Sequence, residues 1–186
     1  GPTSVPSALV KGCENLQIVM FTGRTQNLTV IEAAAFKETK NLNTVSLPDT
    51  IKTISKEAFY HSAIQNIHLP KNLKQIGTMA FAGNELKNIV ISNKTKKLGD
   101  YAFRNCKELT EVTLPKSVTK IPSGIFEGCC NLKTVNAPNV DTVCEHAFYD
   151  CKNLEAFNFS KLQTLERMAF AYTGIHEAIF SDRLVN

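Results

Sequence analysis

The residues of this chain best suited to metal binding or nucleophilic chemistry are four histidines and six cysteines. The histidines share no common spacing. His68 and His176 both fall in or beside segments that we expect to be strands, but five repeats of the pattern described below separate them. At strand spacing this is roughly 20–25 Å, which is too far apart for one metal ion. We therefore predict no metal site.

Three of the cysteines, Cys106, Cys129 and Cys151, follow one another at intervals of 23 and 22 residues. They occupy one position of the repeat, where other copies have a small polar residue. We interpret them as a ladder of buried thiols that bond to backbone groups in a turn. Neighbouring coils of a stacked fold lie about 5 Å apart, which is within disulfide range, so a bridge between coils stays open. Cys130 is expected to be an exposed thiol.

Catalytic and nucleotide-binding motifs are missing from the sequence. The carboxylates are scattered and form no pair for acid–base catalysis. The glycines form neither G-x-x-x-x-G-K nor G-x-G-x-x-G. The sequence therefore predicts no cofactor and no enzymatic activity. A net charge of only +4, with no aromatic residues among the lysines, argues against nucleic-acid binding. No apolar segment is long enough for insertion into a membrane.

The feature that organises the whole chain is an apolar–aromatic pair, usually Ala-Phe, that returns every 22 or 23 residues. A period this regular indicates one structural unit stacked on copies of itself. Stacked units usually work as binding surfaces. The pairs are Ala35-Phe36, Ala58-Phe59, Ala80-Phe81, Ala102-Phe103, Ile125-Phe126, Ala147-Phe148 and Ala169-Phe170.

Each copy continues with the pattern L-x-x-V-x-L, often closed by proline, as in Leu109–Pro115. The V-x-L part has the period of two that is typical of a strand with one buried face, and the proline ends the strand. We expect the ring of each Ala-Phe pair to fill the interior of its coil. A single coil is too small to bury these groups, so neighbouring coils complete the core.

These features resemble the leucine-rich repeats, and specifically the BspA-like (treponemal-type) class with its Leu-Pro step and Ala-Phe-x-x-Cys segment. The resemblance covers roughly residues 8–185. It implies a leucine-rich repeat solenoid of stacked 22–23-residue coils, with a parallel β-sheet on the concave face, short strands or turns elsewhere and little α-helix. It also implies a cell-surface or secreted module, because members are found on bacterial and protist surfaces and adhere to host matrix proteins or to other microbes.

We expect one solenoid domain over residues 8–186, with about seven full repeats and partial ends, because no linker or low-complexity run divides the chain. Residues 1–7 are expected to be a disordered lead-in, with Gly1-Pro2 left over from removal of a tag. Neither end shows the polar cap that a solenoid needs. We therefore interpret the chain as a fragment of a longer protein.

The outward positions of the predicted strands form the first candidate binding surface. By resemblance, this surface binds a protein ligand such as a host extracellular-matrix or cell-surface protein. The alternative is a solvated face without a ligand, since these columns contain no Tyr, Trp or Arg anchor. The predicted contact residues are Thr44, Ser46, Asn66, His68, Asn88, Val90, Glu111, Thr113, Thr134, Asn136 and Asn158.

A second candidate surface is a row of lysines, which stacking would align along four consecutive coils. Such a lysine stripe attracts sulfated glycans, acidic proteins or anionic surfaces. The alternative is a solvated face that keeps the array soluble. The stripe consists of Lys52, Lys74, Lys96, Lys97 and Lys120.

The sequence thus predicts a non-catalytic recognition module that binds a protein or glycan partner in adhesion to host matrix or to other cells. The alternative function is a structural scaffold in which copies self-associate through repeat ends and edges.

Overall fold

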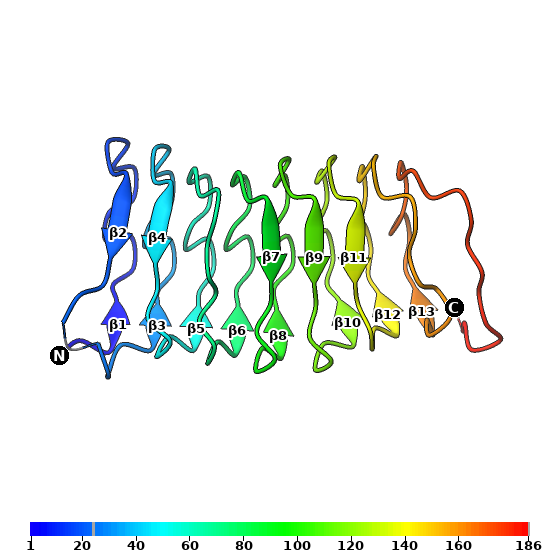
Figure 1. The fold of residues 1–186 in the computed structure, drawn as a ribbon, viewed down its shortest axis with the longest axis horizontal. Coiled ribbons are helices and arrows are strands. Elements are labelled where there is room, and N and C mark those ends of the chain that lie inside the picture. The colour runs from blue at the N-terminus through cyan, green and yellow to red at the C-terminus, as the bar shows by residue number, and fades with distance from the viewer. Residues whose placement is uncertain (24, 186) are drawn as a thin grey trace.

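The structure, a computed structural model, describes residues 1–23 and 25–185 as an elongated stack of coils (Figure 1). Most coils contribute short parallel strands, which line up in two rows along the stack, and the described residues contain no α-helix. This confirms the predicted solenoid. The first row consists of β2 (Ile18–Met20), β4 (Thr44–Ser46), β7 (Asn88–Val90), β9 (Glu111–Thr113) and β11 (Thr134–Asn136). The second row consists of β1 (Ser4–Val5), β3 (Val30–Ile31), β5 (Thr53–Ile54), β6 (Gln75–Ile76), β8 (Lys97–Leu98), β10 (Lys120–Ile121), β12 (Thr142–Val143) and β13 (Thr164–Leu165).

The V-x-L segments form the first row, in register with one another. Val112 of β9 pairs with Ile89 on one side and with Val135 on the other. In β4 and β7 the middle residue is buried and its two neighbours are exposed, as expected for a sheet with one buried face. The row is divided into two sheets, β2–β4 and β7–β9–β11. Between them, Asn66 makes only an isolated bridge to Thr44.

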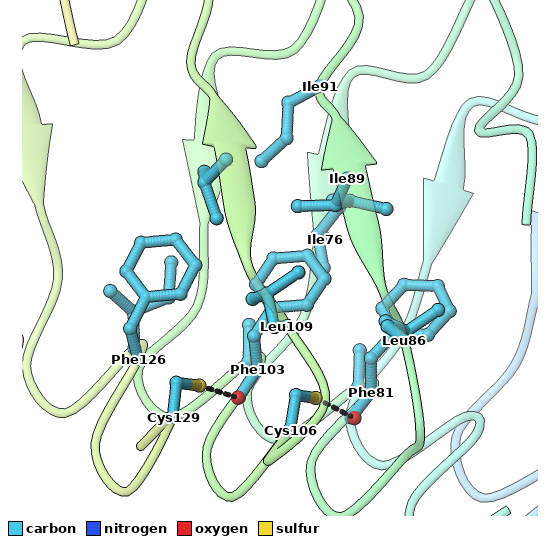
Figure 2. Close-up of a cluster of buried hydrophobic side chains, with 14 of the residues drawn as sticks. Ile76, Phe81, Leu86, Ile89, Ile91, Phe103, Cys106, Leu109, Phe126 and Cys129 are labelled. Carbon is cyan, nitrogen blue, oxygen red and sulfur yellow. Dashed lines mark hydrogen bonds between the residues drawn. The ribbon is translucent and has the colours of Figure 1, made fainter. Parts of the chain in front are cut away.

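The phenylalanines of the Ala-Phe pairs stack over one another along the whole length of the core, as predicted. Consecutive ring centroids from Phe36 to Phe170 lie 5.0–5.8 Å apart, with interplanar angles of 1–18°. Figure 2 shows Phe81, Phe103 and Phe126 in successive coils. The residue before each ring, alanine in every coil except that of Ile125, is also buried, and a small residue there lets adjacent coils approach closely.

The backbone around each Ala-Phe pair is left-handed at two positions, one two residues before the ring and one two residues after it. Around Phe59 these are Glu57 (φ 56°) and His61 (φ 51°). Their amides donate to carbonyls of the next coil, at 2.9 Å to Thr78 and 2.9 Å to Ala82. A non-glycine residue in this conformation costs about 1–2 kcal/mol. The hydrogen bonds between coils offset that cost.

The position three residues after each phenylalanine is buried in every coil but the last, where Thr173 is half-buried, and its side chain donates to a phenylalanine carbonyl. Cys106 Sγ lies 3.3 Å from Phe81 O and Cys129 Sγ 3.1 Å from Phe103 O (Figure 2). Asn84 Nδ2 donates to Phe59 O at 2.6 Å. This confirms the interpretation of the thiols as a buried ladder bonded to backbone. All six cysteines are free, so the inter-coil bridge that the sequence left open is not formed.

The two ends of the chain differ from expectation. Residues 1–7 were expected to be disordered, but β1 pairs with β3 and Val5 is buried against the core. Val5 continues the column of Ile31, which explains why the lead-in is ordered. Near the other end, Asn158 lies in a segment without strand structure. Its neighbours Phe157 and Phe159 pack their rings at 66° to each other, and rings of this size replace the smaller aliphatic residues that hold the other V-x-L segments in register.

Candidate functional site

The structure brings the outward residues of the first row together on one face, hereafter the strand face. The predicted contact residues are all exposed except Thr113, which is half-buried. Paired residues place Asn88, Glu111 and Thr134 in one column and Val90, Thr113 and Asn136 in the next. Sequence analysis missed two members at the N-terminal end, Ile18 and Met20. These residues pair with Thr44 and Ser46 and are 55% and 64% exposed.

A groove of about 770 Å³ crosses the middle of the strand face. Buried residues Ile91, Leu114 and Pro115 line its apolar part. Val90 is 66% exposed and also lines the groove. The other large exposed apolar side chains of the described residues lie in the first coil or in the last two. Val90 is therefore an exposed apolar residue in the interior of the stack. Coils are present on both sides of it, so its exposure does not result from its lying at an end of the stack.

The groove begins where the first row is interrupted, between the segment 65–69 and β7. The coil that contains this segment is one residue shorter than the preceding coil, because Ile64 lies two residues after Ser62 whereas Leu42 lies three residues after Thr39. In the longer coil the amide of Leu42 donates to Thr39 O at 2.9 Å. In the shorter coil the amide of Ile64 donates to Asn84 Oδ1 at 3.1 Å. The Asn84 side chain thus supplies the acceptor that the shorter turn has lost.

Basic and polar side chains surround the apolar part of the groove. Asn66 and His68 line it from one coil. Three lysines line it from successive coils, and each of them follows the Leu-Pro step or its equivalent. Lys71 Nζ lies 3.3 Å from Asp49 Oδ2, and the amide of Lys71 donates to Asp49, which lowers the pKa of that carboxyl. Lys94 and Lys116 make no ion pair within the described part of the chain. The groove therefore combines an apolar centre with unneutralised positive charge.

The predicted lysine stripe is exposed but consists of two columns. Lys52, Lys74 and Lys96 stack in one column, because the amide of Lys74 donates to Lys52 O at 2.8 Å and that of Lys96 to Lys74 O at 3.0 Å. Lys97 lies in the adjacent column, paired with Gln75. Lys120 occupies this second column in the next coil, paired with Thr142, but β8 and β10 belong to different sheets.

The buried thiols are chemically quiet. Burial raises the pKa of Cys106 and of Cys151 to about 12, and burial together with the neighbouring thiols raises the pKa of Cys129 well above its ordinary value. A thiol that stays protonated is a poor nucleophile. Cys130 was expected to be exposed but is half-buried, and Cys13 is the exposed thiol.

Within residues 1–23 and 25–185, no three His, Cys, Asp or Glu side chains are arranged to hold a metal ion. In the same residues, no helix is long and apolar enough to cross a membrane.

The family model described as BspA type leucine-rich repeat region (6 copies) matches residues 3–87 and 74–186. The chain therefore belongs to the BspA-type leucine-rich repeat family. Repeats of this family often occur in surface proteins with protein-binding roles, and the leucine-rich repeat solenoid is typically a non-catalytic binding scaffold. Comparison with curated protein sequences gave no match.

Solved structures of related proteins share this architecture. A leucine-rich repeat protein from Bacteroides ovatus gives a TM-score of 0.88 at 30% identity, over 98% of this chain and 48% of that chain. The leucine-rich repeat protein of T. pallidum gives 0.72 at 29% identity, over 82% of this chain and 71% of that chain. The pneumococcal vaccine antigen PcpA gives 0.57 at 16% identity, over 85% of this chain and 50% of that chain, and shares the fold alone. The present chain thus spans about half the length of the B. ovatus protein.

Proposed function

We propose that this chain is a cell-surface or secreted recognition module whose strand-face groove binds a protein partner in adhesion to host matrix or to other cells. The observation that carries this proposal is the groove of about 770 Å³ around Val90, an exposed apolar residue in the interior of the stack. Interfaces combine an apolar centre with a polar rim, and the groove has both. A rigid stack of coils also limits the conformational entropy lost on binding.

The charges around the groove define the kind of partner segment that fits. Lys94 and Lys116 present positive charge without a carboxylate partner in the described residues. An extended segment that places an apolar side chain against Val90 and an acidic side chain beside the lysines would match both features. Charge complementarity of this kind mainly raises the association rate and selects the partner.

The test is binding of the folded chain to a panel of immobilised extracellular-matrix proteins. Val90→Glu buries a charge in the contact and repels an acidic partner, so we expect its affinity to fall by about tenfold or more. Ala156→Glu is the matched control, because Ala156 is exposed and lies outside the groove. Equal binding by the two variants would contradict the assignment of the groove. A wild-type chain that binds none of the panel saturably would contradict matrix adhesion.

The second candidate function is a scaffold in which copies of the chain stack end to end. The observation that favours it is exposed apolar surface at both ends of the stack, with Met20 at one end and Ile179 and Phe180 at the other. Sedimentation over a wide range of protein concentration tests this function. Growth in size with concentration, abolished by Ile179→Lys, supports the scaffold, and a constant monomer argues against it.

A further inference from the structure

Backbone pairing in the second row stops at one junction in the middle of the stack. Strands β1, β3, β5, β6 and β8 form one sheet, and β10, β12 and β13 form another. The junction between the coils of β8 and β10 therefore lacks the hydrogen-bonded ladder that joins the other coils of this row. Figure 1 shows β8 and β10 as neighbours along the row.

Pro122 explains the interruption. In the other coils, the residue after the second-row strand donates its amide to the preceding coil, as Gly77 does to Ile54 O and Gly99 to Ile76 O, each at 2.8 Å. Pro122 occupies this position, and proline has no amide hydrogen to donate. Ile125 adds bulk at the same junction, because it stands where the other coils have alanine. The ring spacing of 5.8 Å between Phe103 and Phe126 is the widest in the phenylalanine stack.

The interruption leaves a cleft of about 510 Å³, which we call the junction cleft. Lys96 and Lys97 line it from one coil and Lys120 from the next. The amide of Lys97 donates to Lys74 O at 3.2 Å. For the equivalent amide of Lys120, the described part of the chain provides no acceptor. The cleft thus offers a backbone donor in addition to three ammonium groups.

The electrostatic balance of the junction cleft is positive. None of its three lysines lies within 4.0 Å of a carboxylate in residues 1–23 and 25–185. Asp100 is the acidic residue of the lining, and its Oδ1 already accepts the amide of Ser123 at 3.2 Å. Ammonium groups together with a free backbone N–H form a site for a tetrahedral oxyanion.

We propose that the junction cleft binds a sulfate group of a sulfated glycan chain. Further sulfate groups of the same chain would follow Lys74 and Lys52, which continue the exposed column away from the cleft with one positive charge in each coil. A linear polyanion matches such a row, because each sulfate meets one ammonium group. This site is lined by residues different from those of the strand-face groove, so it is independent of the function proposed above.

The first test is binding of the folded chain to a size-defined sulfated oligosaccharide, measured by calorimetry. The triple variant Lys96→Gln, Lys97→Gln and Lys120→Gln should lose about tenfold or more in affinity, because three charged contacts are removed. The control variant, Lys11→Gln, Lys107→Gln and Lys133→Gln, removes the same charge from exposed positions outside the cleft and should lose less than about threefold. Equal losses in the two variants would overturn the proposal.

The second test separates the cleft from the lysines that line it. Pro122→Ser restores an amide donor at a position where Ser55 donates to Ile31 O at 2.9 Å in another coil. This variant should close the ladder, keep or raise the thermal unfolding temperature, and weaken oligosaccharide binding at least about threefold with every lysine present. Unchanged affinity in a folded Pro122→Ser variant would overturn the cleft as the site.

Two further ligands test whether the junction cleft recognises the sulfate groups of a glycan. The desulfated oligosaccharide should bind at least about tenfold more weakly than the sulfated one, because it carries no oxyanion for the lysines. Inorganic polyphosphate of matched charge should bind more weakly than the sulfated oligosaccharide if the glycan is the ligand. Equal binding of the desulfated chain, or tighter binding of polyphosphate, would overturn the assignment to a sulfated glycan.

Discussion

Truncation of one ring in the middle of the phenylalanine stack, Phe81→Ala, tests how the core is held together. Phe81 is fully buried and lies between Phe59 at 5.3 Å and Phe103 at 5.6 Å. Replacing a buried phenylalanine by alanine costs about 3–5 kcal/mol, and each lost ring pair adds about 0.5–1.5 kcal/mol beyond buried area. Because two ring pairs are lost, we expect the free energy of unfolding to fall by about 4–8 kcal/mol.

Urea unfolding followed by circular dichroism measures this loss, since the chain has four tyrosines and no tryptophan. The matched control is Phe36→Ala at the end of the stack, where the ring has one stacked neighbour, Phe59, at 5.0 Å. The control should lose about 1 kcal/mol less than Phe81→Ala, because only one ring pair is removed. A loss below about 2 kcal/mol for Phe81→Ala would refute the reasoning, because it would place the ring outside a close-packed core.

Three further changes test the backbone, the thiols and the coil spacing. Met79 has φ 54°, so Met79→Val should lower the free energy of unfolding by about 1 kcal/mol or more and Met79→Gly should leave it equal or higher. If urea unfolding showed the valine variant to be more stable than the glycine variant, the left-handed conformation of residue 79 would be contradicted. The pKa of Cys106 and Cys151 is raised to about 12, whereas unfolded thiols titrate near about 8.5. The unfolded state therefore binds fewer protons above pH ~8.5, and stability present below that pH should be lost as pH rises toward about 12, by about 1.4 kcal/mol per thiol per pH unit. Replacement of Cys106, Cys129 and Cys151 by serine, which Ser62 shows to fit this column, should flatten the urea midpoint between pH 8.5 and 10.5, and an equally steep decline would contradict the assignment to these thiols. In Gly99→Ala the added Cβ would lie 2.3 Å from Thr78 N and 2.4 Å from Gly77 C. We expect the free energy of unfolding to fall by about 1–3 kcal/mol, as in an overpacked core, and the thermal unfolding temperature to fall with it. An unchanged temperature would show that the coils are not held at this spacing.

The period of the Ala-Phe pairs was sufficient to predict the stacked coils, the buried rings and the ladder of thiols. A phenylalanine that recurs every 22 or 23 residues is buried when the coils stack, because its ring then packs against the equivalent rings of the adjacent coils. The columns of the strand face followed from the alternation in the V-x-L segments for the same reason. The order of residues 4–5 escaped prediction, because a two-residue strand carries no period of its own.

The strand-face groove and the junction cleft both lie where the repeat changes locally, and the repeat pattern itself does not reveal such changes. The interruption between residues 65–69 and β7 lies between two coils that both have the shorter turn, Ser62–Ile64 and Asn84–Leu86, and Asn84 supplies the replacement acceptor for the first of them. The junction cleft depends on Pro122, whose effect is visible only when the amide donors of the equivalent residues are known. The left-handed positions were likewise hidden, because residues such as Met79 and Tyr101 occupy sites that favour glycine.

Site-specific photo-crosslinking tests most directly whether the strand-face groove is the contact surface. A photoreactive side chain replaces Val90 in one sample and Ala156 in a second, and each is irradiated with the matrix protein that the wild-type chain binds. Val90 lies in the groove and Ala156 lies outside it, and both are exposed. We predict an adduct from position 90 that excess unlabelled chain suppresses, and little or none from position 156. An adduct from position 156 with none from position 90 would contradict the account.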